Sequence, residues 1–512
     1  MKNQALSSGL KRIKKLQNKS QVFETKEFEP LEVTELKKAG FLKEIINGWV
    51  YLSSPIEQEY ETTSWYINYW EFINKYLKKR FKSNYCLNPE ASLLLHNNER
   101  YIPKQISIIT KTGAVSNIKL PFGTSLLTYP DVNNFPKKEH IMKLRGINVM
   151  SVEYALCKAG PTYYRDKQKE VEILMTSKWD FQKTIQILTD SKSKMTTAAS
   201  RIHGALTFFE RKEEAEILKS LYDATFGGSL NSSNPFNKDA VRFLSSNKAK
   251  SVTSLKLEAM WNNYRDIVEK IGQNLTKTTF TAEKIESMLE VVKQQDMYHS
   301  LSIEGYKITD ELIEKVIKGN WNPEFDDNDK KTKDALAAKG YADAFNEIKN
   351  DLKEEVSSNV YGNKFVEKLH SKWFVKLFGS SVQSGVLKAS DLVGYRKHQV
   401  FIRNSKHIPL EECELLDAME TYFELLANEK DSFVQAVLGH HLFGYIHPYM
   451  DGNGRMARFI MNAFLILGGI NWTVIRVERR EEYMNVLESA SVDEDIEPFA
   501  RFVLDSIEKS NV

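Results

Sequence analysis

Residues 440–458, which read HHLFGYIHPYMDGNGRMAR, place narrow limits on the local fold. Apolar residues upstream recur at spacings that give a helix one apolar face. Pro448 disfavours helical geometry at the preceding residue, so this helix should end at His447. A glycine-rich turn follows, and an apolar run after Arg455 begins a second helix. The sequence therefore predicts two helices joined by a short loop that carries a histidine.

The start of the second helix is suited to bind phosphate. Gly452, Asn453 and Gly454 allow backbone angles and a close approach that bulkier residues would resist. Free backbone N–H groups at a helix N-terminus attract an anion. Arg455 and Arg458 add two positive charges in the first turn. This combination predicts an anion-binding site.

Two further residues of the loop can take part in chemistry. Asp451 can hold Mg2+ that bridges phosphate oxygens. His447 can accept a hydroxyl proton near neutral pH. Metal binding by His440, His441 and His447 is an alternative, although their spacing matches no common site. The favoured interpretation is an in-line displacement at phosphorus.

The stretch HPYMDGNGRMAR resembles the Fic signature, HPFx(D/E)GNGRxxR, at every defined position except Tyr449, where the family favours phenylalanine. The resemblance extends over about residues 280–505 and includes a flap hairpin over 394–409 and closing helices over 480–503. It implies a mainly α chain whose C-terminal part is an all-α Fic fold with a small β-hairpin flap. The Fic region is expected over 255–512, with its core at 365–505.

The resemblance implies a protein adenylyltransferase that moves AMP from ATP, with Mg2+, to a Ser, Thr or Tyr hydroxyl of a target protein or of the chain itself. His447 would deprotonate the hydroxyl, and Asp451 would hold the metal. The flap would cover the adenosine, and Tyr483 would lie near the adenine. The ATP-binding residues that it implies are Val400, Phe401, Ile402, Arg403, Asp451, Gly452, Asn453, Gly454, Arg455, Met456, Ala457, Arg458 and Tyr483.

A helix predicted over residues 281–305 ends in SLSIEG. Ser300 and Glu304 lie one turn apart, and Gly305 can end the helix. This motif resembles the family's inhibitory motif, (S/T)xxxE(G/N), in the class that carries it N-terminal to the catalytic core. The resemblance implies that Glu304 pairs with Arg458 and so keeps ATP in an unproductive pose.

The N-terminal half has a different character. Residues 1–75 combine a basic segment with two strands hinged at Asn47 and Gly48, which predicts a winged helix and with it a possible DNA contact. Residues 76–240 mix strand and helix patterns and resemble bacterial abortive-infection antitoxins, so an α+β domain is expected there. The segment over 228–238, GSLNSSNPFNK, has the composition of a linker.

Composition limits the possible partners. The chain has 71 Lys and Arg against 68 Asp and Glu, and this near-balance gives no overall field towards nucleic acid or an anionic membrane. Cys86, Cys157 and Cys413 are far apart and odd in number, which favours a reducing compartment, so a cytoplasmic protein without a membrane partner is expected. The longest apolar stretch, 459–470, is too short to span a bilayer.

Three other functions are compatible with these patterns. The chain could be a DNA-binding regulator or antitoxin-like protein that self-modification switches. The same loop could transfer another nucleotide or phosphocholine, or could remove AMP with the help of Glu304. The target protein, the release of inhibition and the state of assembly stay open, with a dimer among the options.

Overall fold

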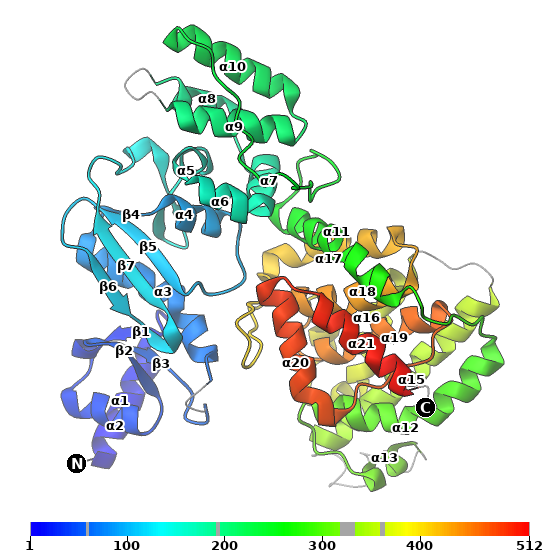
Figure 1. The fold of residues 1–512 in the computed structure, drawn as a ribbon. Coiled ribbons are helices and arrows are strands. Elements are labelled where there is room, and N and C mark those ends of the chain that lie inside the picture. The colour runs from blue at the N-terminus through cyan, green and yellow to red at the C-terminus, as the bar shows by residue number, and fades with distance from the viewer. Residues whose placement is uncertain (1, 58–60, 191–194, 318–332, 359–363, 511–512) are drawn as a thin grey trace. The chain divides into compact units, whose positions relative to one another are not determined.

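The computed structural model describes residues 2–57, 61–190, 195–317, 333–358 and 364–510. The chain divides into two compact units (Figure 1). The first contains Met1–Leu255 and Phe401–Ile408, and the second contains Lys256–Val400 and Pro409–Val512. The first unit is therefore discontinuous in sequence.

The first unit begins with a small three-stranded antiparallel sheet in the order β1-β3-β2. The predicted hairpin forms, and Gly48 in its turn has a positive φ of 86° that glycine adopts without strain. Ile13, Phe23, Leu36 and Val50 form the core between helices and sheet. The elements are α1 (Lys2–Leu16), β1 (Val22–Glu24), α2 (Pro30–Lys38), β2 (Leu42–Ile46) and β3 (Trp49–Leu52). The winged helix stays a prediction.

A second sheet follows in the order β4-β5-β7-β6, in which only β5 and β7 are parallel. The aromatic helix α3 crosses residue 75 and packs in one core with Trp49 of the first sheet and Ile106 of the second. The elements are α3 (Thr63–Phe81), β4 (Tyr85–Leu87), α4 (Pro89–His96), β5 (Gln105–Thr110), β6 (Ser116–Lys119), β7 (Ser125–Pro130) and the hairpin β8 (Ile141–Leu144) and β9 (Ile147–Met150).

Helices complete the first unit, and the segment after them differs from a free linker. Residues 228–251 form no helix or strand, and they include 228–238, for which the sequence predicts a linker. Leu230 and Phe236 are nevertheless buried in the core of the preceding helices, because the segment returns along them. The helices are α5 (Val152–Lys158), α6 (Pro161–Asp166), α7 (Gln168–Ser177), α8 (Phe181–Leu188), α9 (Thr196–Phe208) and α10 (Lys212–Phe226).

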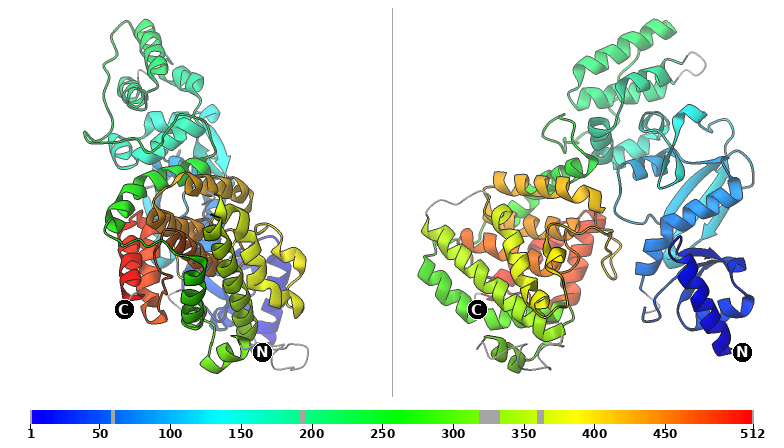
Figure 2. Two further views of the ribbon diagram at one scale, coloured as in Figure 1. Left: turned by 90° about the vertical axis from the view of Figure 1, so that its right-hand side faces the viewer. Right: turned by 180° about the vertical axis from the view of Figure 1, so that it is seen from behind.

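The second unit is helical around the adjacent pair α18 and α19 (Figures 1 and 2). Almost every residue of α18 is buried, so this helix is enclosed rather than apolar on one face as the sequence predicts. Among the described residues, no helix combines the length and apolar character needed to span a membrane. The helices are α11 (Val252–Gly272), α12 (Ala282–Ile303), α13 (Asp310–Ile317), α15 (Lys333–Ser357), α16 (Phe365–Gln383), α17 (Leu415–Asn428), α18 (Ser432–Ile446), α19 (Asn453–Leu467), α20 (Arg480–Glu488) and α21 (Glu497–Ser510).

The expected flap differs from a β-hairpin. Residues 394–409, all described, contain no pair of strands. The chain turns at Asn404, whose φ is +61°, and Ser405 N–H donates to the Ile402 carbonyl at 3.2 Å. The single bridge of this segment joins His407 to Tyr101 of the first unit. His407 thus pairs outside the segment, which the local sequence pattern could not reveal.

Candidate functional site

His447 follows the last turn of α18 in a left-handed conformation, with φ 56° and ψ 60°. Its Nδ1 lies 3.2 Å from the Gly444 carbonyl. Because a carbonyl can only accept, Nδ1 carries the proton in the neutral ring, which leaves the Nε2 lone pair available. Burial lowers the pKa of His447 to about 4, so the ring is neutral at physiological pH. The predicted base is therefore in its proton-accepting form.

Arg396 holds the loop that carries His447, although sequence reasoning placed it only in the flap. Its Nε donates to the His447 carbonyl at 2.8 Å, and its backbone N–H donates to the Pro448 carbonyl at 2.9 Å. The guanidinium also donates to the carbonyls of His398 and Leu410. A buried arginine bonded to carbonyls positions backbone through several fixed donors. Residues 394–396 located the flap segment in the sequence, but nothing in the local pattern indicated that Arg396 holds the loop of His447.

Tyr449, the departure from the family pattern, packs inward. Its ring stacks on Phe374 with centroids 3.6 Å apart and planes 5° apart. Its backbone N–H donates to Asn453 Oδ1 at 2.9 Å, and the Asn453 amide returns a bond to its carbonyl at 2.8 Å. The Asn453 side chain therefore closes the loop, and only its backbone is left to line an anion site.

Gly452 enters α19 with a φ of +82°. A Cβ there would lie 2.8 Å from a ring carbon of Phe378, so a side chain would be both strained and crowded. The first turn of α19 begins directly afterwards, and its N–H groups have no partner within the helix. The glycine loop thus presents a helix N-terminus, as predicted.

Two arginines of α19 are buried beside this terminus. The Arg455 guanidinium lies 5.3 Å from the ring centre of Tyr306 and 5.1 Å from that of Phe378. Its Nε atom and Nη1 of Arg458 donate no hydrogen bond to any described residue, and its Nη2 atom lies 3.3 Å from the Asp451 carboxylate. Buried N–H groups of cations without an acceptor are costly. These groups are suited to receive an anion.

Glu304 caps α12 and lies against the same terminus. Its Oε1 accepts from Arg458 Nη2 at 2.8 Å, and Ser300 accepts from Arg458 through Oγ at 2.8 Å and through its carbonyl at 3.0 Å. Burial opposes the charge of Arg458, but the Glu304 carboxylate raises the pKa of Arg458 overall. A Cβ on Gly454 would collide with Glu304 Oε1. A carboxylate therefore lies directly against the first turn of α19.

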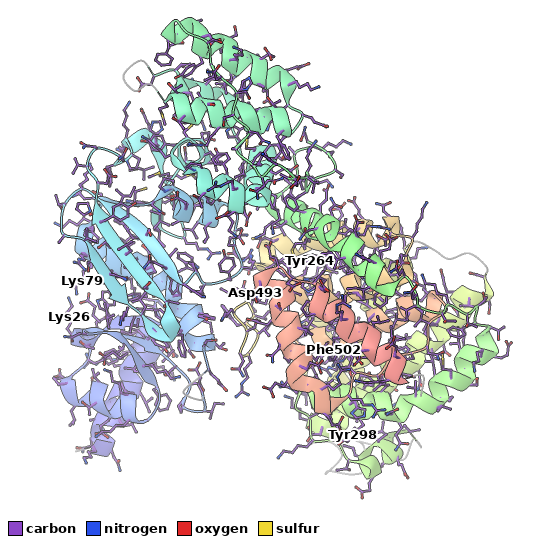
Figure 3. All side chains as sticks on the ribbon, viewed as in Figure 1. Lys26, Lys79, Tyr264, Tyr298, Asp493 and Phe502 are labelled. Atoms are coloured by element: carbon purple, nitrogen blue, oxygen red, sulfur yellow. The ribbon has the colours of Figure 1, made fainter. Side chains whose placement is uncertain are left out.

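Three other predicted ATP-binding residues of the second unit have buried side chains. The side chains of Met456 and Ala457 are buried in the core. Tyr483 is 1% exposed; its hydroxyl lies 2.6 Å from His440 Nε2, and its ring stacks on Phe502, which Figure 3 labels on α21. Burial raises the pKa of Tyr483. Tyr483 is thus a core residue in this structure.

The flap residues divide between the units. Val400 belongs to the second unit, whereas Phe401, Ile402 and Arg403 belong to the first. Arg403 Nε donates to Glu61 Oε1 at 3.0 Å. Within the second unit, the structure brings the residues over 447–458 together with Ser300 and Glu304.

Asp451 is the candidate metal ligand. Its carboxylate is largely exposed, accepts from the Gly452 N–H at 2.6 Å, and lies 3.3 Å from Arg455 Nη2. No group of three or more metal-ligating side chains occurs among the described residues. One accessible carboxylate fits Mg2+, which takes its other ligands from phosphates and water.

Comparisons with known proteins match part of the chain to Fic proteins. Residues 363–465 match the Fic/DOC family. The chain is 37% identical over 120 residues to protein adenylyltransferase Fic of Nematostella vectensis, which covers 23% of this chain and 27% of that protein. Over the same length it is 34% identical to the Drosophila melanogaster protein of that name, covering 23% and 24%. The chain thus matches about a quarter of the length of these relatives.

Solved structures give a more distant likeness. Fic-1 (residues 134–508) of C. elegans has a TM-score of 0.36 at 17% identity, covering 67% of this chain and 86% of that one. A Fic domain containing signaling protein of Bacteroides thetaiotaomicron has a TM-score of 0.35 at 17% identity, with coverage of 50% and 94%.

Proposed function

Because residues 363–465 are a Fic domain, we propose that the chain transfers AMP from ATP to a Ser, Thr or Tyr hydroxyl of a protein, the chain itself included. Glu304 restrains this reaction. The strongest support comes from the N-terminal end of α19. Two buried arginines there have N–H groups without acceptors, and the Glu304 carboxylate lies in the place suited to an anion.

His447 would accept the proton that the target hydroxyl loses in the reaction. The hydroxyl oxygen of the target attacks the α-phosphorus of ATP, and a new P–O bond forms. The bond from that phosphorus to the bridging oxygen of the β-phosphate breaks, and pyrophosphate leaves. The hydroxyl proton passes to Nε2 of His447, whose Nδ1–H faces the Gly444 carbonyl. The proton later returns to solvent.

The phosphates would be held at the N-terminus of α19. Backbone N–H groups of Asn453 and Gly454 point out of its first turn, and Arg455 and Arg458 supply donors beside them. Mg2+ held by Asp451 would offset charge on the phosphate oxygens. Arg396 would keep His447 in register with this site through its bonds to the loop carbonyls.

Restraint follows from what Glu304 occupies. Its carboxylate takes up Arg458 Nη2 and puts a negative charge against Gly454, where a phosphate oxygen would otherwise bind. The Glu304 carboxylate and a phosphate oxygen at Gly454 would repel each other, because both are negatively charged. A triphosphate could then bind only in a displaced pose, which does not align the α-phosphorus for attack.

The test is intact-mass measurement of purified Glu304→Gly protein incubated with ATP and Mg2+. A gain equal to one AMP is expected, with little gain for the unaltered chain and none for Glu304→Gly/His447→Ala. A gain that survives the loss of His447, or none in any variant with α-labelled ATP and candidate protein targets, would contradict the proposal. Parallel incubation with other nucleoside triphosphates and with CDP-choline identifies the transferred group.

The first unit supports a second candidate function, contact with DNA. Lys11, Lys14 and Lys15 of α1 are exposed on a helix whose apolar residues pack on the small sheet. An exposed basic face gives salt-dependent attraction to phosphate backbones. Retention of the full chain on duplex DNA should fall as salt rises and should weaken when these three lysines become glutamine. Equal retention of both proteins would exclude this face.

A further inference from the structure

Asp296 is a buried carboxylate on the same helix as Ser300 and Glu304, and the proposed reaction does not use it. It lies on α12 one turn before Ser300 and two turns before Glu304, so the three side chains follow one face of the helix. Only 4% of Asp296 is exposed. Burial of a carboxylate opposes folding unless hydrogen bonds compensate for the lost water.

Tyr341 of α15 supplies such a hydrogen bond. Its hydroxyl donates to Asp296 Oδ2 at 2.6 Å. The ring is fully buried and rests on Phe459 of α19, with ring centroids 4.8 Å apart. Burial and the Asp296 carboxylate raise the pKa of Tyr341 well above its usual value, so the hydroxyl keeps its proton and acts as the donor. The Tyr341 side chain thus connects α12, α15 and α19.

The Asp296 carboxylate is charged at neutral pH. Burial raises the pKa of Asp296 to about 6. The Tyr341 hydroxyl, the Trp472 indole and the Arg458 guanidinium favour the charged form. A buried charge that loses a hydrogen-bond donor is strongly penalised. Helix α12 therefore favours the one position in which the hydroxyl and the carboxylate meet.

Other contacts of α12 define its position less sharply. Near its start, Lys349 of α15 donates to Glu286 at 2.5 Å and also to Glu290. The side chains of these two glutamates are 38% and 50% exposed, and exposed ion pairs contribute little. Met297 is buried, but apolar contacts are not directional. The buried bond is the contact that allows least displacement.

We propose that Asp296 and Tyr341 are positioning residues of the restraint, an inference that rests on the proposed function of Glu304. Their hydrogen bond fixes α12 along α15, which lies beside it in Figure 1. In this position Ser300 and Glu304 meet Arg458. Neither Asp296 nor Tyr341 belongs to the groups of the reaction. They are needed for the restraint and not for AMP transfer.

Removal of a single hydroxyl tests the proposal. Tyr341→Phe takes away the donor and keeps the ring, and Tyr298→Phe, at a residue of α12 that Figure 3 labels, is the matched control. With α-labelled ATP and Mg2+, self-modification of the otherwise unaltered chain should rise about tenfold for Tyr341→Phe and not for the control. In the Glu304→Gly protein, Tyr341→Phe should change the rate by less than about twofold. A loss of activity in both backgrounds would show that the bond supports only the fold.

Substitution of the acceptor gives a second series. Asp296→Asn keeps an acceptor for the hydroxyl, so self-modification should stay within about twofold of the unaltered chain. Asp296→Ala should match Tyr341→Phe, and the two changes together should have no larger effect than either one. Equal rates for Tyr341→Phe and the unaltered chain, beside an active Glu304→Gly protein, would overturn the inference.

Amide hydrogen exchange gives a readout that needs no AMP transfer. Exchange over residues 300–304 should be faster in Tyr341→Phe than in Tyr298→Phe, because the last turn of α12 loses its fixed point. Equal exchange in the two proteins would refute the inference. If the Glu304→Gly protein transfers no AMP, the proposed function fails, and the exchange measurement alone decides whether the bond holds α12.

Discussion

Burial has two opposite effects on His447, the proposed base: it keeps the imidazole neutral, and it makes the imidazole a weaker proton acceptor. Its left-handed backbone places the imidazole at the end of a buried helix, and burial lowers the pKa of His447 to about 4. The ring is then neutral over the whole physiological range, but it is a weaker base than an exposed histidine. The Gly444 carbonyl fixes the tautomer, so Nε2 is the only ring atom that can accept the proton.

The pH dependence of AMP transfer should reflect this burial. The base is active when neutral, so activity is retained above the pKa of His447 and is lost as pH falls through it. For the Glu304→Gly protein, kcat/KM should change little between about pH 7.5 and about pH 5.5, where an exposed histidine would lose about tenfold. An acid limb centred near the ordinary histidine pKa would contradict this. Separate measurement of ATP binding over the same range is the control.

Arg396 should prove necessary for catalysis although it lies outside the signature. Arg396→Lys removes fixed donors to the carbonyls of His447 and Leu410, so the loop can shift. In the Glu304→Gly background, kcat should fall about 10- to 100-fold with little change in ATP affinity. Arg501→Lys, on an exposed face of α21, is the matched control. Unchanged turnover would show that Arg396 does not position the loop.

The end of α12 engages both arginines of α19. Glu304 and Ser300 bind Arg458, Gly305 ends the helix with a φ of +86°, and Tyr306 then places its ring on Arg455. Under the proposed function, we expect release of the restraint to require movement of the last turn of α12, because this turn contacts both arginines.

Ser300→Ala should weaken the restraint without removing Glu304. The substitution takes the Oγ acceptor from Arg458 Nε, a bond worth about 1–2 kcal/mol because the donor is charged. Self-modification of the otherwise unaltered chain should rise roughly fivefold. Ser287→Ala, on an exposed part of α12, should leave it unchanged. Equal rates for the two proteins would show that Ser300 has no part in the restraint.

The flap segment should depend on the first unit for its order. Glu61→Gln weakens the ion pair with Arg403, while His407 stays bridged to Tyr101. Amide hydrogen exchange over residues 402–406 should therefore become faster, with little change in α18. Glu139→Gln, which changes an exposed carboxyl of the same unit, is the control. Unaltered exchange in the segment would show that the ion pair does not hold it.

Local and non-local features were predictable to different degrees. Neighbours in the chain determine the helix ends around His447, the hairpin at Gly48 and the helical turn from Ser300 to Glu304. Each of these three features has the predicted local structure. The bridge from His407 to Tyr101 and the burial of Tyr483 depend on partners far away in sequence. Periodicity contains no information on such partners, so the fold of the flap segment and the burial of Tyr483 could not be anticipated in the same way.

At the scale of the molecule, two compact units of different character share one chain. The first contains three sheets, and the second contains the helices around α18 and α19. The chain passes between the units after Leu255, after Val400 and after Ile408. Separate hydrophobic cores allow each unit to unfold in a transition of its own.

Calorimetry should separate the two units. We expect two unfolding transitions, of which only one shifts upward with Mg2+ and an ATP analogue whose α–β bridge is methylene. At 100 times the dissociation constant, the nucleotide stabilises the unit that binds it by about 2.7 kcal/mol. The Glu304→Gly protein should show a larger shift than the unaltered chain at equal nucleotide concentration. A shift of both transitions, or of neither, would contradict independent binding by the second unit.

Because the first unit is discontinuous in sequence, its two parts are synthesised at different times. Residues 401–408 are made long after Leu255, so the nascent N-terminal unit waits with Tyr101 and Glu61 unoccupied by their later partners. Domains generally fold as they emerge, at a few residues to tens of residues per second. The last piece of the first unit is therefore installed only when the polypeptide between Lys256 and Val400 has already left the exit tunnel.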